Sequence, residues 1–413
     1  MLNLVLKKYP SPHLLETITL EAVQELIKEC TPYSIILIEV YFMQMAQKRV
    51  TSCDTSVPLI SSIFFRSTDS KKQVIVVSLP GESDVQYLDN LQFIADFAIE
   101  MDGKTKGRDH LFIVHDESGL KYLKNHKFTN ARLIQVKQSL DMWMRDFPPT
   151  MPKQQVKFKY RPQYISTEQA KFDEGNFEKF ASVVGLPQLR RSDLVLEGGN
   201  IVDNGVDIAI TTARTYDDNP TMSHQEFVNK LETAIQRKVA VLPDPEDTTG
   251  HADGVVTFVE NNTLLISLFD DADGPSFYDA METAVLDVFP NLTVVPLPCY
   301  AKKGKTQGFV SAEGSYANSL VTNNAVYLPF FANQTSNDRA FAAFKNNTNK
   351  DIIPVYNAGK VPVLGGSLRC MTWQIDQEHP VAKALFAYVD RSPSSGSSVN
   401  VVVTVFFLQV ALA

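Results

Sequence analysis

The chain has 413 residues, of which 44% are hydrophobic and 21% are charged. This composition is typical of a globular protein, and the length predicts two domains or one domain built from repeats. The net charge of −8 argues against a nucleic acid or an anionic membrane surface as a partner. Four cysteines in this length do not make a disulfide framework and favour a reducing compartment: Cys30, Cys53, Cys299 and Cys370.

Neither end of the chain carries a pattern typical of membrane insertion. Lys7 and Lys8 follow a very short apolar run, which is not the order of a signal peptide. The apolar stretch at 399–413 is interrupted by polar residues and is shorter than the ~18 residues of a membrane span. We therefore expect a cytoplasmic protein.

Hydrophobic periodicity predicts mixed α/β structure from the start of the chain. Helical spacing within 13–48 leads into a β-rich run at 34–40. The elements expected next are strands at 60–65 and 74–79, a helix at 83–101, a strand at 111–114, a short helix at 117–125 and a strand at 133–136.

The same alternation of helix and strand returns three times further along the chain. The pairs are helix 223–236 with strand 239–242, helix 275–288 with strand 292–295, and helix 336–347 with strand 352–355. The serine-rich segment 392–398 predicts a flexible connection to a β-prone end at 399–407. We expect that end to pair with strand 34–40, because an unpaired apolar strand would aggregate.

Glycine-marked turns recur at Leu196–Asn200, Ala312–Tyr316 and Leu364–Ser367. Candidate polar residues keep a similar spacing of 51 positions (146 to 197), 54 positions (197 to 251) and 119 positions (251 to 370). Five units of about this length would fill most of the chain. A unit of one helix and several short strands cannot bury its apolar face alone, so the spacing favours units arranged in a ring. Coincidence in an ordinary α/β chain is the alternative.

Cys370 follows an apolar run and the glycine pair Gly365–Gly366. Glycines let the backbone turn and let a ligand approach closely. A thiol at such a turn is a candidate nucleophile when a histidine and carboxylates occur elsewhere. The alternative is a small buried hydrophobic residue.

Four other polar residues stand in turns after apolar runs: Asp146, Glu197, His251 and Asp253. On an extended chain, the spacing of two between His251 and Asp253 puts both side chains on one face. Each residue has an ordinary alternative: Asp146 could pair with Arg145, Glu197 could cap a helix, and His251 could be a core residue.

Together these residues favour a planar cationic substrate. Several carboxylates facing one pocket repel one another unless a cation lies between them. A guanidinium offers five donors that match carboxylates bidentately. Holding it in place for attack by a thiolate is worth up to ~7–11 kcal/mol in favourable cases. A metal site is the weaker interpretation, because one histidine with scattered carboxylates lacks the usual ligand spacing.

Five segments then resemble, in order over about residues 60–376, the motifs of the agmatine deiminase / bacterial-type peptidylarginine deiminase family, which belongs to the guanidino-group-modifying, or pentein, superfamily. They are Trp143–Asp146, Glu197–Ile201, Thr249–Asp253, Ser315–Asn318 with Asn324 and Pro329, and Gly365–Cys370. The resemblance implies a five-bladed α/β propeller of ββαβ modules around one central active site. The expected parts are an N-terminal extension (1–55), the deiminase domain (56–376) and a C-terminal extension (377–413).

The resemblance also implies roles for single residues. Cys370 matches the nucleophile, His251 the general acid and base, and Glu197 the acidic partner near the histidine and substrate. Asp146 and Asp253 match the carboxylates that hold the guanidinium. The residues expected to complete substrate binding are Trp143, Gly366 and Asn200. The implied reaction passes through a thiouronium adduct on sulfur and needs no metal or organic cofactor.

The sequence departs from the family pattern at Pro148, Asp218, Ser367, Arg369 and Trp373. Because the catalytic set is intact, these changes affect the substrate more than the chemistry. Arg369 could lower the pKa of the neighbouring thiol or bind an acidic group of the substrate.

Four functions remain open from the sequence. The first is hydrolysis of agmatine to N-carbamoylputrescine and ammonia. The others are the same chemistry on a peptidyl arginine, transfer of the amidino group to an amine, and a non-catalytic propeller that serves as a binding module. The expected partner is a small guanidino compound or a peptide, and the two extensions could cover the pocket, form a homodimer or bind a partner.

Overall fold

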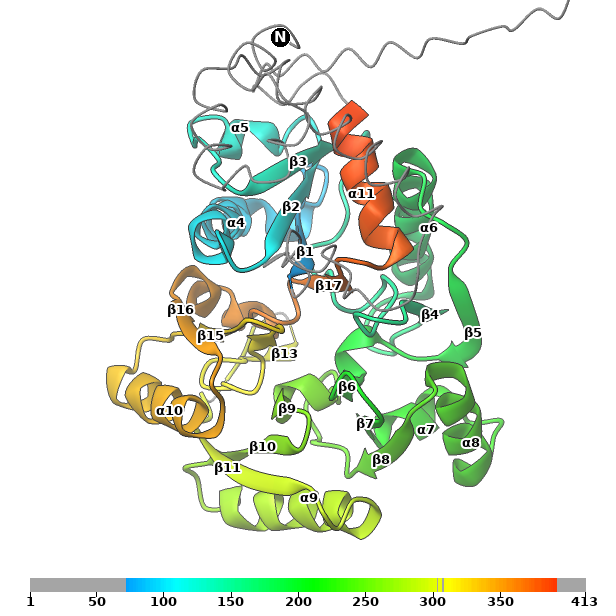
Figure 1. The fold of residues 1–413 in the computed structure, drawn as a ribbon, viewed down its shortest axis with the longest axis vertical. Coiled ribbons are helices and arrows are strands. Elements are labelled where there is room, and N and C mark those ends of the chain that lie inside the picture. Colours follow the sequence, from blue (N-terminus) through cyan, green and yellow to red (C-terminus); the bar gives the residue numbers. More distant parts are fainter. Residues whose placement is uncertain (1–71, 303, 307, 392–413) are drawn as a thin grey trace, which may run out of the picture. The chain divides into compact units, whose positions relative to one another are not determined.

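The computed structural model describes residues 72–302, 304–306 and 308–391 (Figure 1). The helix predicted within 13–48, the strands predicted at 34–40 and 60–65, and the serine-rich connection with its terminal strand at 399–407 lie outside the described residues. Within the described ranges, no helix has both the length and the apolar character needed to cross a membrane.

The first sheet joins the two ends of the described chain. Its strands are β1 (Gln73–Leu79), β2 (His110–His115), β3 (Ala131–Gln135) and β17 (Trp373–Asp376), in the order β17-β1-β2-β3. β1, β2 and β3 are parallel, whereas β17 runs antiparallel to β1. Every residue of β1 is buried, as expected of a β-branched strand covered on both faces. The last strand therefore completes the sheet that the first one begins.

Helices cover both faces of this sheet. α4 (Leu91–Thr105) packs on one face, preceded by a 3-10 turn at Val85–Asn90 and followed across β2 by the short α5 (Leu120–Leu123). α6 (Thr167–Val184) and α11 (Pro380–Arg391) pack on the other. Trp373 is fully buried there, 5.6 Å from the ring of Phe177, and its indole N–H donates to Gln155 Oε1 at 2.9 Å. Trp373, one of the residues that depart from the family pattern, therefore lies in the core and not in the site.

α6 also connects the two parallel strands of the second sheet, β4 (Val156–Lys159) and β5 (Arg190–Val195). The helix begins after Ser166, whose hydroxyl accepts from the backbone N–H of Gln169. It ends at Gly185 with φ of 71°, a left-handed conformation that glycine adopts without strain.

The two sheets described so far, each with its helices, are the first and second modules. Three further modules share one topology, in which an antiparallel hairpin is followed by a helix and a parallel strand. The third module contains β6 (Val202–Asp203), β7 (Ile208–Thr212), α7 (Arg214–Asp218), α8 (His224–Ile235) and β8 (Lys238–Leu242). The fourth contains β9 (Val256–Glu260), β10 (Thr263–Phe269), α9 (Gly274–Val288) and β11 (Thr293–Cys299), and the hairpin β12 (Lys305–Thr306) and β13 (Phe309–Val310) follows it. The fifth contains β14 (Leu320–Val321), β15 (Ala325–Pro329), α10 (Gln334–Asn347) and β16 (Asp351–Val355). β6 lies beside β9, and β9 beside β14, so neighbouring modules meet through their first strands.

Most predicted elements in the described ranges are present with shifts of a few residues, including the three later helix–strand pairs. The helix predicted at 83–101 is wrong at its start, because Asp84 Oδ2 accepts from Gly81 N–H and Ser139 Oγ and so holds a turn there. Three helices of the described ranges were not predicted: α6, α7 and α11. α6 shows the expected spacing at Phe177, Phe180, Ala181 and Val184, and α11 lies in the segment expected to be an extension.

The candidate residues occupy equivalent positions in the five modules. The connection that carries Asp146 follows β3, and the one with Glu197 follows β5. The connection with His251 and Asp253 follows β8, and that with Cys370 follows β16. Asn318 stands at the same place after β11. The repeat thus places one polar connection per module at the site.

Candidate active site

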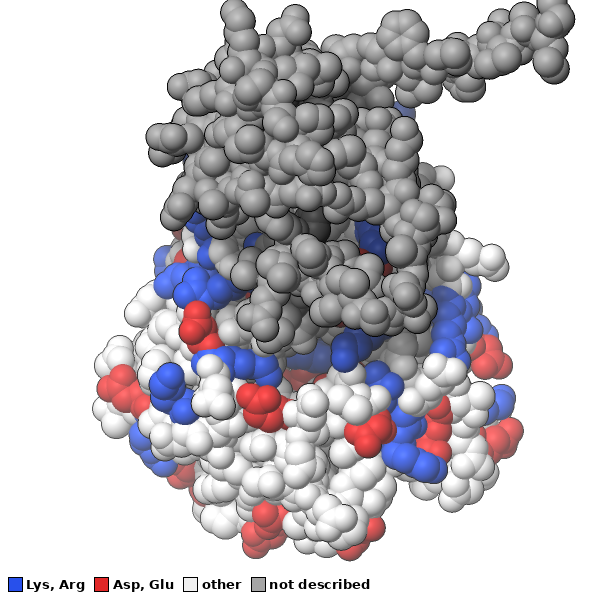
Figure 2. Space-filling model, in the orientation of Figure 1, with Lys and Arg blue, Asp and Glu red and all other residues white. Residues whose placement is uncertain are grey.

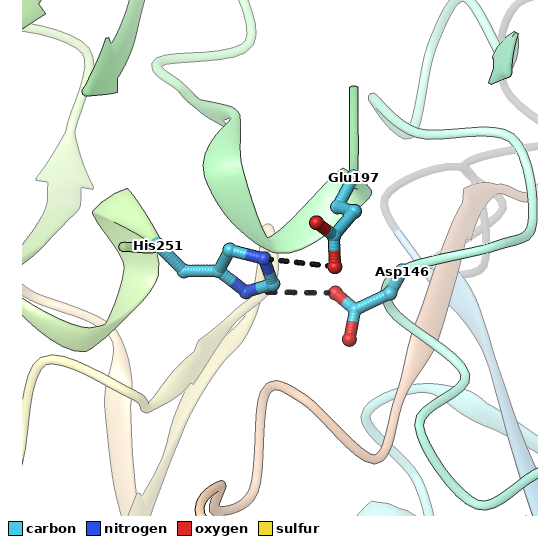
Figure 3. Close-up of side chains that lie close together, drawn as sticks. All are labelled: Asp146, Glu197 and His251. Atoms are coloured by element: carbon cyan, nitrogen blue, oxygen red, sulfur yellow. Dashed lines mark ion pairs between the residues drawn. The ribbon is translucent and has the colours of Figure 1, made fainter. Parts of the chain in front are cut away.

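The imidazole of His251 faces two buried carboxylates, those of Asp146 and Glu197 (Figure 3). Its Nδ1 is 3.8 Å from Asp146 Oδ1, and its Nε2 is 3.1 Å from Glu197 Oε2. The contact with Glu197 is an ion pair whose direction does not make a good hydrogen bond, so Nε2 lacks a hydrogen-bond partner within the described residues. Tyr164 donates its hydroxyl to the same Glu197 oxygen. Glu197 is therefore held from one side and attracts the imidazole on the other.

Gly199 allows this close approach. Its backbone N–H donates to Asp146 Oδ1 at 3.1 Å. A Cβ at this position would lie 2.4 Å from His251 Nδ1 and 2.7 Å from Asp146 Oδ1. Any side chain here would separate the imidazole from the carboxylate, which explains the glycine physically.

Cys370 is held by Asn318 from the fourth module. The Asn318 amide Nδ2 donates to Cys370 Sγ at 3.0 Å, and its Oδ1 accepts the backbone N–H groups of Arg369 (3.0 Å) and Cys370 (3.2 Å). Asp253 Oδ2 lies 4.0 Å from the sulfur. The backbone N–H of Arg145 donates to the Cys370 carbonyl at 3.0 Å. This bond links the turn that carries the Cys370 thiol, called the thiol turn below, to the connection that carries Asp146.

Burial and mutual charge set the protonation of the site. Burial raises the pKa of Asp146 to about 7, against the attraction of His251. Burial disfavours the imidazolium of His251, but the carboxylates of Glu197 and Asp146 outweigh it and raise its pKa to about 10. Burial and the carboxylates of Asp253 and Asp146 raise the pKa of the Cys370 thiol well above its ordinary value. A cation beside the sulfur would reverse that effect.

One cavity of about 520 Å³ joins most of these groups. The predicted site residues that line it are Asp146, His251, Asp253, Cys370, Trp143 and Gly366. Glu197 lies behind this lining, against His251. A Cβ at Gly366 would lie 2.5 Å from Trp143 Cζ3, so this glycine lets the indole approach the thiol turn.

Asn200 is the one predicted substrate-binding residue that the structure places away from both the cavity and its ion pairs. Its Oδ1 accepts the backbone N–H groups of Thr212 and Ala252, both at 3.1 Å. It therefore holds the turn that presents His251. That turn is a 3-10 segment at Ala252–Gly254 and not the extended chain expected from the spacing, yet His251 and Asp253 still reach the same cavity.

Arg369 does not enter this cavity. Its Nη1 donates to Asp253 Oδ2 at 2.6 Å and its Nη2 to the Ile201 carbonyl at 2.8 Å. The guanidinium is engaged by Asp253 outside the cavity lining, which argues against the expected contact with an acidic group of the substrate. The pKa of the Cys370 thiol is raised overall, chiefly by burial, and an effect of Arg369 on it stays a prediction. Arg369 instead fixes the position of one Asp253 oxygen.

A second pair of acidic residues lines the same cavity. Asp141 Oδ2 accepts from Tyr87 Oη at 2.9 Å, and Asp173 Oδ1 accepts from Gln169 Nε2 at 2.8 Å. Burial raises the pKa of Asp141 to about 6, and burial with the nearby Asp141 raises that of Asp173 to about 8. The sequence analysis missed this pair.

Asn318 and Tyr164 were also not predicted as site residues. Asn318 ends the segment Ser315–Asn318, which resembles a family motif. Its position after the last strand of the fourth module could have identified it as a site residue. Tyr164 stands in no such pattern and is brought in by the fold.

The charges of the site also fit a metal ion. The ligand atoms of Asp146, Glu197 and His251 lie within 4.8 Å of one another. The same set fits a guanidinium, whose donors pair with carboxylates, and the neighbouring thiol adds a nucleophile that a structural metal site does not need.

Fold and site together define a modular α/β protein with a cysteine, a histidine and three carboxylates at the junction of its modules. Residues 67–376 match the sequence model of the Porphyromonas-type peptidyl-arginine deiminase family, and the chain belongs to this family.

Individual relatives are more distant. Agmatine deiminase of Medicago truncatula is 26% identical over 230 residues, which are 48% of this chain and 61% of that protein. Agmatine deiminase of Pseudomonas fluorescens is 25% identical over 242 residues, 49% of this chain and 62% of the relative. The matched part thus spans about three fifths of these relatives.

Solved structures support the fold. Agmatine deiminase of C. jejuni superposes with a TM-score of 0.61 at 20% identity, over 74% of this chain and 94% of that one. The agmatine deiminase of Enterococcus faecalis superposes with a TM-score of 0.59 at 18% identity, over the same shares of the two chains.

Proposed function

We propose that this protein is a guanidine deiminase, which hydrolyses a guanidino compound to a ureido product and ammonia. The observation that carries the proposal is the meeting of the Cys370 thiol, the His251 imidazole and the carboxylates of Asp146 and Asp253 on one cavity. Membership of a family described as peptidyl-arginine deiminases, and relatives named agmatine deiminases, support the same reaction class. The five equivalent connections support a closed five-bladed propeller as the scaffold.

In the first stage the substrate guanidinium lies between Asp146 and Asp253. Its positive charge favours the Cys370 thiolate, and the thiol proton leaves to solvent. Sulfur bonds to the guanidinium carbon, and the electrons of the C=N bond move to nitrogen. His251, charged at neutral pH because of its raised pKa, donates a proton to the leaving nitrogen. The C–N bond breaks, ammonia departs, and a thiouronium stays on sulfur.

In the second stage water replaces ammonia. Neutral His251 takes a proton from this water, and the oxygen bonds to the thiouronium carbon. The C–S bond then breaks and the pair of electrons returns to the sulfur of Cys370. The proton of the remaining hydroxyl leaves to solvent as the C=O bond forms, and the ureido product leaves. Glu197 and Tyr164 orient the imidazole through both stages.

Agmatine is the favoured substrate. The cavity has the volume of a small-molecule site. Asp141 and Asp173 line the same cavity, where they would attract the second positive charge that agmatine carries at the end opposite its guanidinium. A peptidyl arginine has no such charge at that end and is the alternative substrate.

The test is an assay of ammonia and ureido product with agmatine, free arginine and a blocked arginine peptide. We expect turnover of agmatine in preference to both others, and no turnover by Cys370→Ala. Cys299→Ala is the matched control, because Cys299 is also a buried free cysteine but lies outside the cavity lining. Preference for the blocked peptide would assign the alternative substrate. Turnover only with an added amine acceptor would indicate amidino transfer, and no turnover of any compound would favour a binding module.

A further inference from the structure

A second cavity, of about 120 Å³, lies where the first strands of several modules meet. Residues of β6, β9, β14 and β17 line it. Among the described residues, none lines both this cavity and the one that holds Cys370. The connection at Arg145–Asp146 separates the two, since Arg145 lines one cavity and Asp146 the other.

Arg145 brings an uncompensated charge to this second cavity. Its side chain is buried, with 3% of its surface exposed. Its two side-chain hydrogen bonds are long, 3.4 Å to the Arg369 carbonyl and 3.4 Å to Thr372 Oγ1, and both acceptors are neutral. No carboxylate of the described chain lies within ion-pair distance of its guanidinium. Buried charges are ordinarily paired, because desolvation is otherwise expensive.

The other charged groups around the cavity are already matched. Asp203 Oδ2 lies 4.0 Å from Arg237 Nε, and Glu260 Oε2 lies 3.7 Å from Lys350 Nζ. Arg369 is paired with Asp253. Lys153, exposed at the rim, donates to the Gly205 carbonyl and adds a further positive charge. The lining therefore carries a positive excess centred on Arg145.

Ser319 offers a second free donor. It is fully buried, it lines the same cavity, and its hydroxyl makes no hydrogen bond with the described residues. A buried hydroxyl without a partner is costly and is normally satisfied by a ligand or water. Burial and the nearby Arg369 lower the pKa of Arg145 to about 9, against the attraction of Asp253 and Asp146, neither of which lies within ion-pair distance of its guanidinium.

We propose that this cavity binds a small monovalent anion of the size of chloride, held by the guanidinium of Arg145 and the hydroxyl of Ser319. One uncompensated buried charge calls for one negative charge. The carboxylates of Asp203 and Glu260 on the same lining disfavour a multivalent oxyanion. The bound anion fixes the side chain of Arg145, which donates to the Arg369 carbonyl next to Cys370. In this way it stabilises the turn that carries Cys370 from the side opposite the large cavity.

The experiment measures thermal unfolding of the full chain in sodium chloride and in sodium gluconate at one ionic strength. Gluconate is too large for the cavity. Chloride at about 100 times its Kd should raise the wild-type Tm by several degrees. Ser319→Ala and Arg145→Met should lose most of this difference. Ser276→Ala, which removes a hydroxyl from the exposed start of α9, should keep it.

Crystals grown in sodium bromide provide a direct measurement. We expect an anomalous peak within contact distance of the Arg145 guanidinium, and none there in Ser319→Ala. If Arg145→Met does not fold, the Ser319→Ala comparison and the bromide peak still decide. Equal Tm values in chloride and gluconate, an unchanged response in Ser319→Ala, or a cavity that holds only water in bromide would each overturn the proposal.

Discussion

The two cavities differ in the sign of the charge that each leaves uncompensated. The larger one is lined by Asp146, Asp253, Asp141 and Asp173 and by the buried imidazole of His251, and among these carboxylates Asp253 is also paired with Arg369. The smaller one holds Arg145 without a carboxylate and Ser319 without a partner. They meet at the pair Arg145–Asp146, two adjacent residues whose side chains face different cavities.

This difference shows how buried charge reports on a missing ligand. A fold stabilises a buried ion with a partner or leaves it for a ligand of opposite sign. The described part of the face drawn in Figure 2 gives no such signal, because basic and acidic side chains are interspersed over it. Inside, the excess is negative in one cavity and positive in the other, and the two signs can be tested separately.

The largest effect is expected at the nucleophile. Cys370→Ala should lower kcat by on the order of 10³-fold or more, since no other group can form the covalent adduct. The measurement is ammonia release from agmatine, with circular dichroism to show an intact fold. Cys299→Ala should stay close to wild type. Activity of Cys370→Ala near the wild-type level would remove the nucleophile assignment.

The second largest effect is expected from the loss of one of the two carboxylates that hold the substrate guanidinium. Asp253→Asn should lower kcat/KM by about 10²- to 10³-fold, because the site loses a charge that orients the cation and Arg369 loses its partner. Asp244→Asn serves as control: Asp244 also pairs with an arginine, Arg214, but not at the cavity lining. Steady-state kinetics of both variants give the comparison. An Asp253→Asn enzyme with wild-type kcat/KM would mean that the guanidinium binds elsewhere.

The sequence identified residues that meet on one cavity more readily than it predicted the elements around them. Asp146, His251, Asp253 and Cys370 stand in short glycine- or proline-marked turns, where close approach of the backbone leaves few alternatives to glycine. Gly199 and Gly366 show this directly, since a Cβ at either would collide with a site side chain.

The parts that sequence reasoning missed depend on contacts between distant segments. The role of Arg369 depends on Asp253, 116 positions away, and no local pattern tells which way its side chain points. Asp173 lies on α6, a helix whose polar sequence hid its five buried apolar positions. The unpaired charge of Arg145 becomes visible only when every carboxylate nearby has been assigned to another cation.

Gly199→Ala should destabilise the fold and the site together. The added methyl group would overlap His251 and Asp146, and overpacking of this kind costs about 1–3 kcal/mol. The matched control is Gly175→Ala in α6, where a Cβ meets nothing within 4 Å and helix propensity favours alanine. Urea unfolding should show a lower midpoint for Gly199→Ala and an equal or higher one for Gly175→Ala. Equal stability of both variants would contradict the packing described for His251.

Ionisation of Asp173 should make the binding of agmatine depend on pH. Its pKa of about 8 means that the carboxyl is mostly neutral at pH 7 and ionised at pH 9, whereas an aliphatic amine stays charged over this range. The KM for agmatine should therefore fall roughly tenfold as pH rises from 7 to 9, in a step that Asp173→Asn lacks. Butylguanidine, which has no second cation, should show no such step. The same pH dependence for both compounds would separate Asp173 from substrate binding.

The smallest effect is expected from metal removal, and it decides between the two ligands that Asp146, Glu197 and His251 could hold. If the cation of the large cavity is the substrate guanidinium, dialysis against EDTA should leave kcat and KM for agmatine unchanged. Added Zn²⁺ should then inhibit in competition with agmatine, because both would bind the carboxylate of Asp146. Loss of activity in EDTA that Zn²⁺ restores would instead make these three residues a metal centre, and the negative excess of this cavity would belong to the ion and not to the substrate.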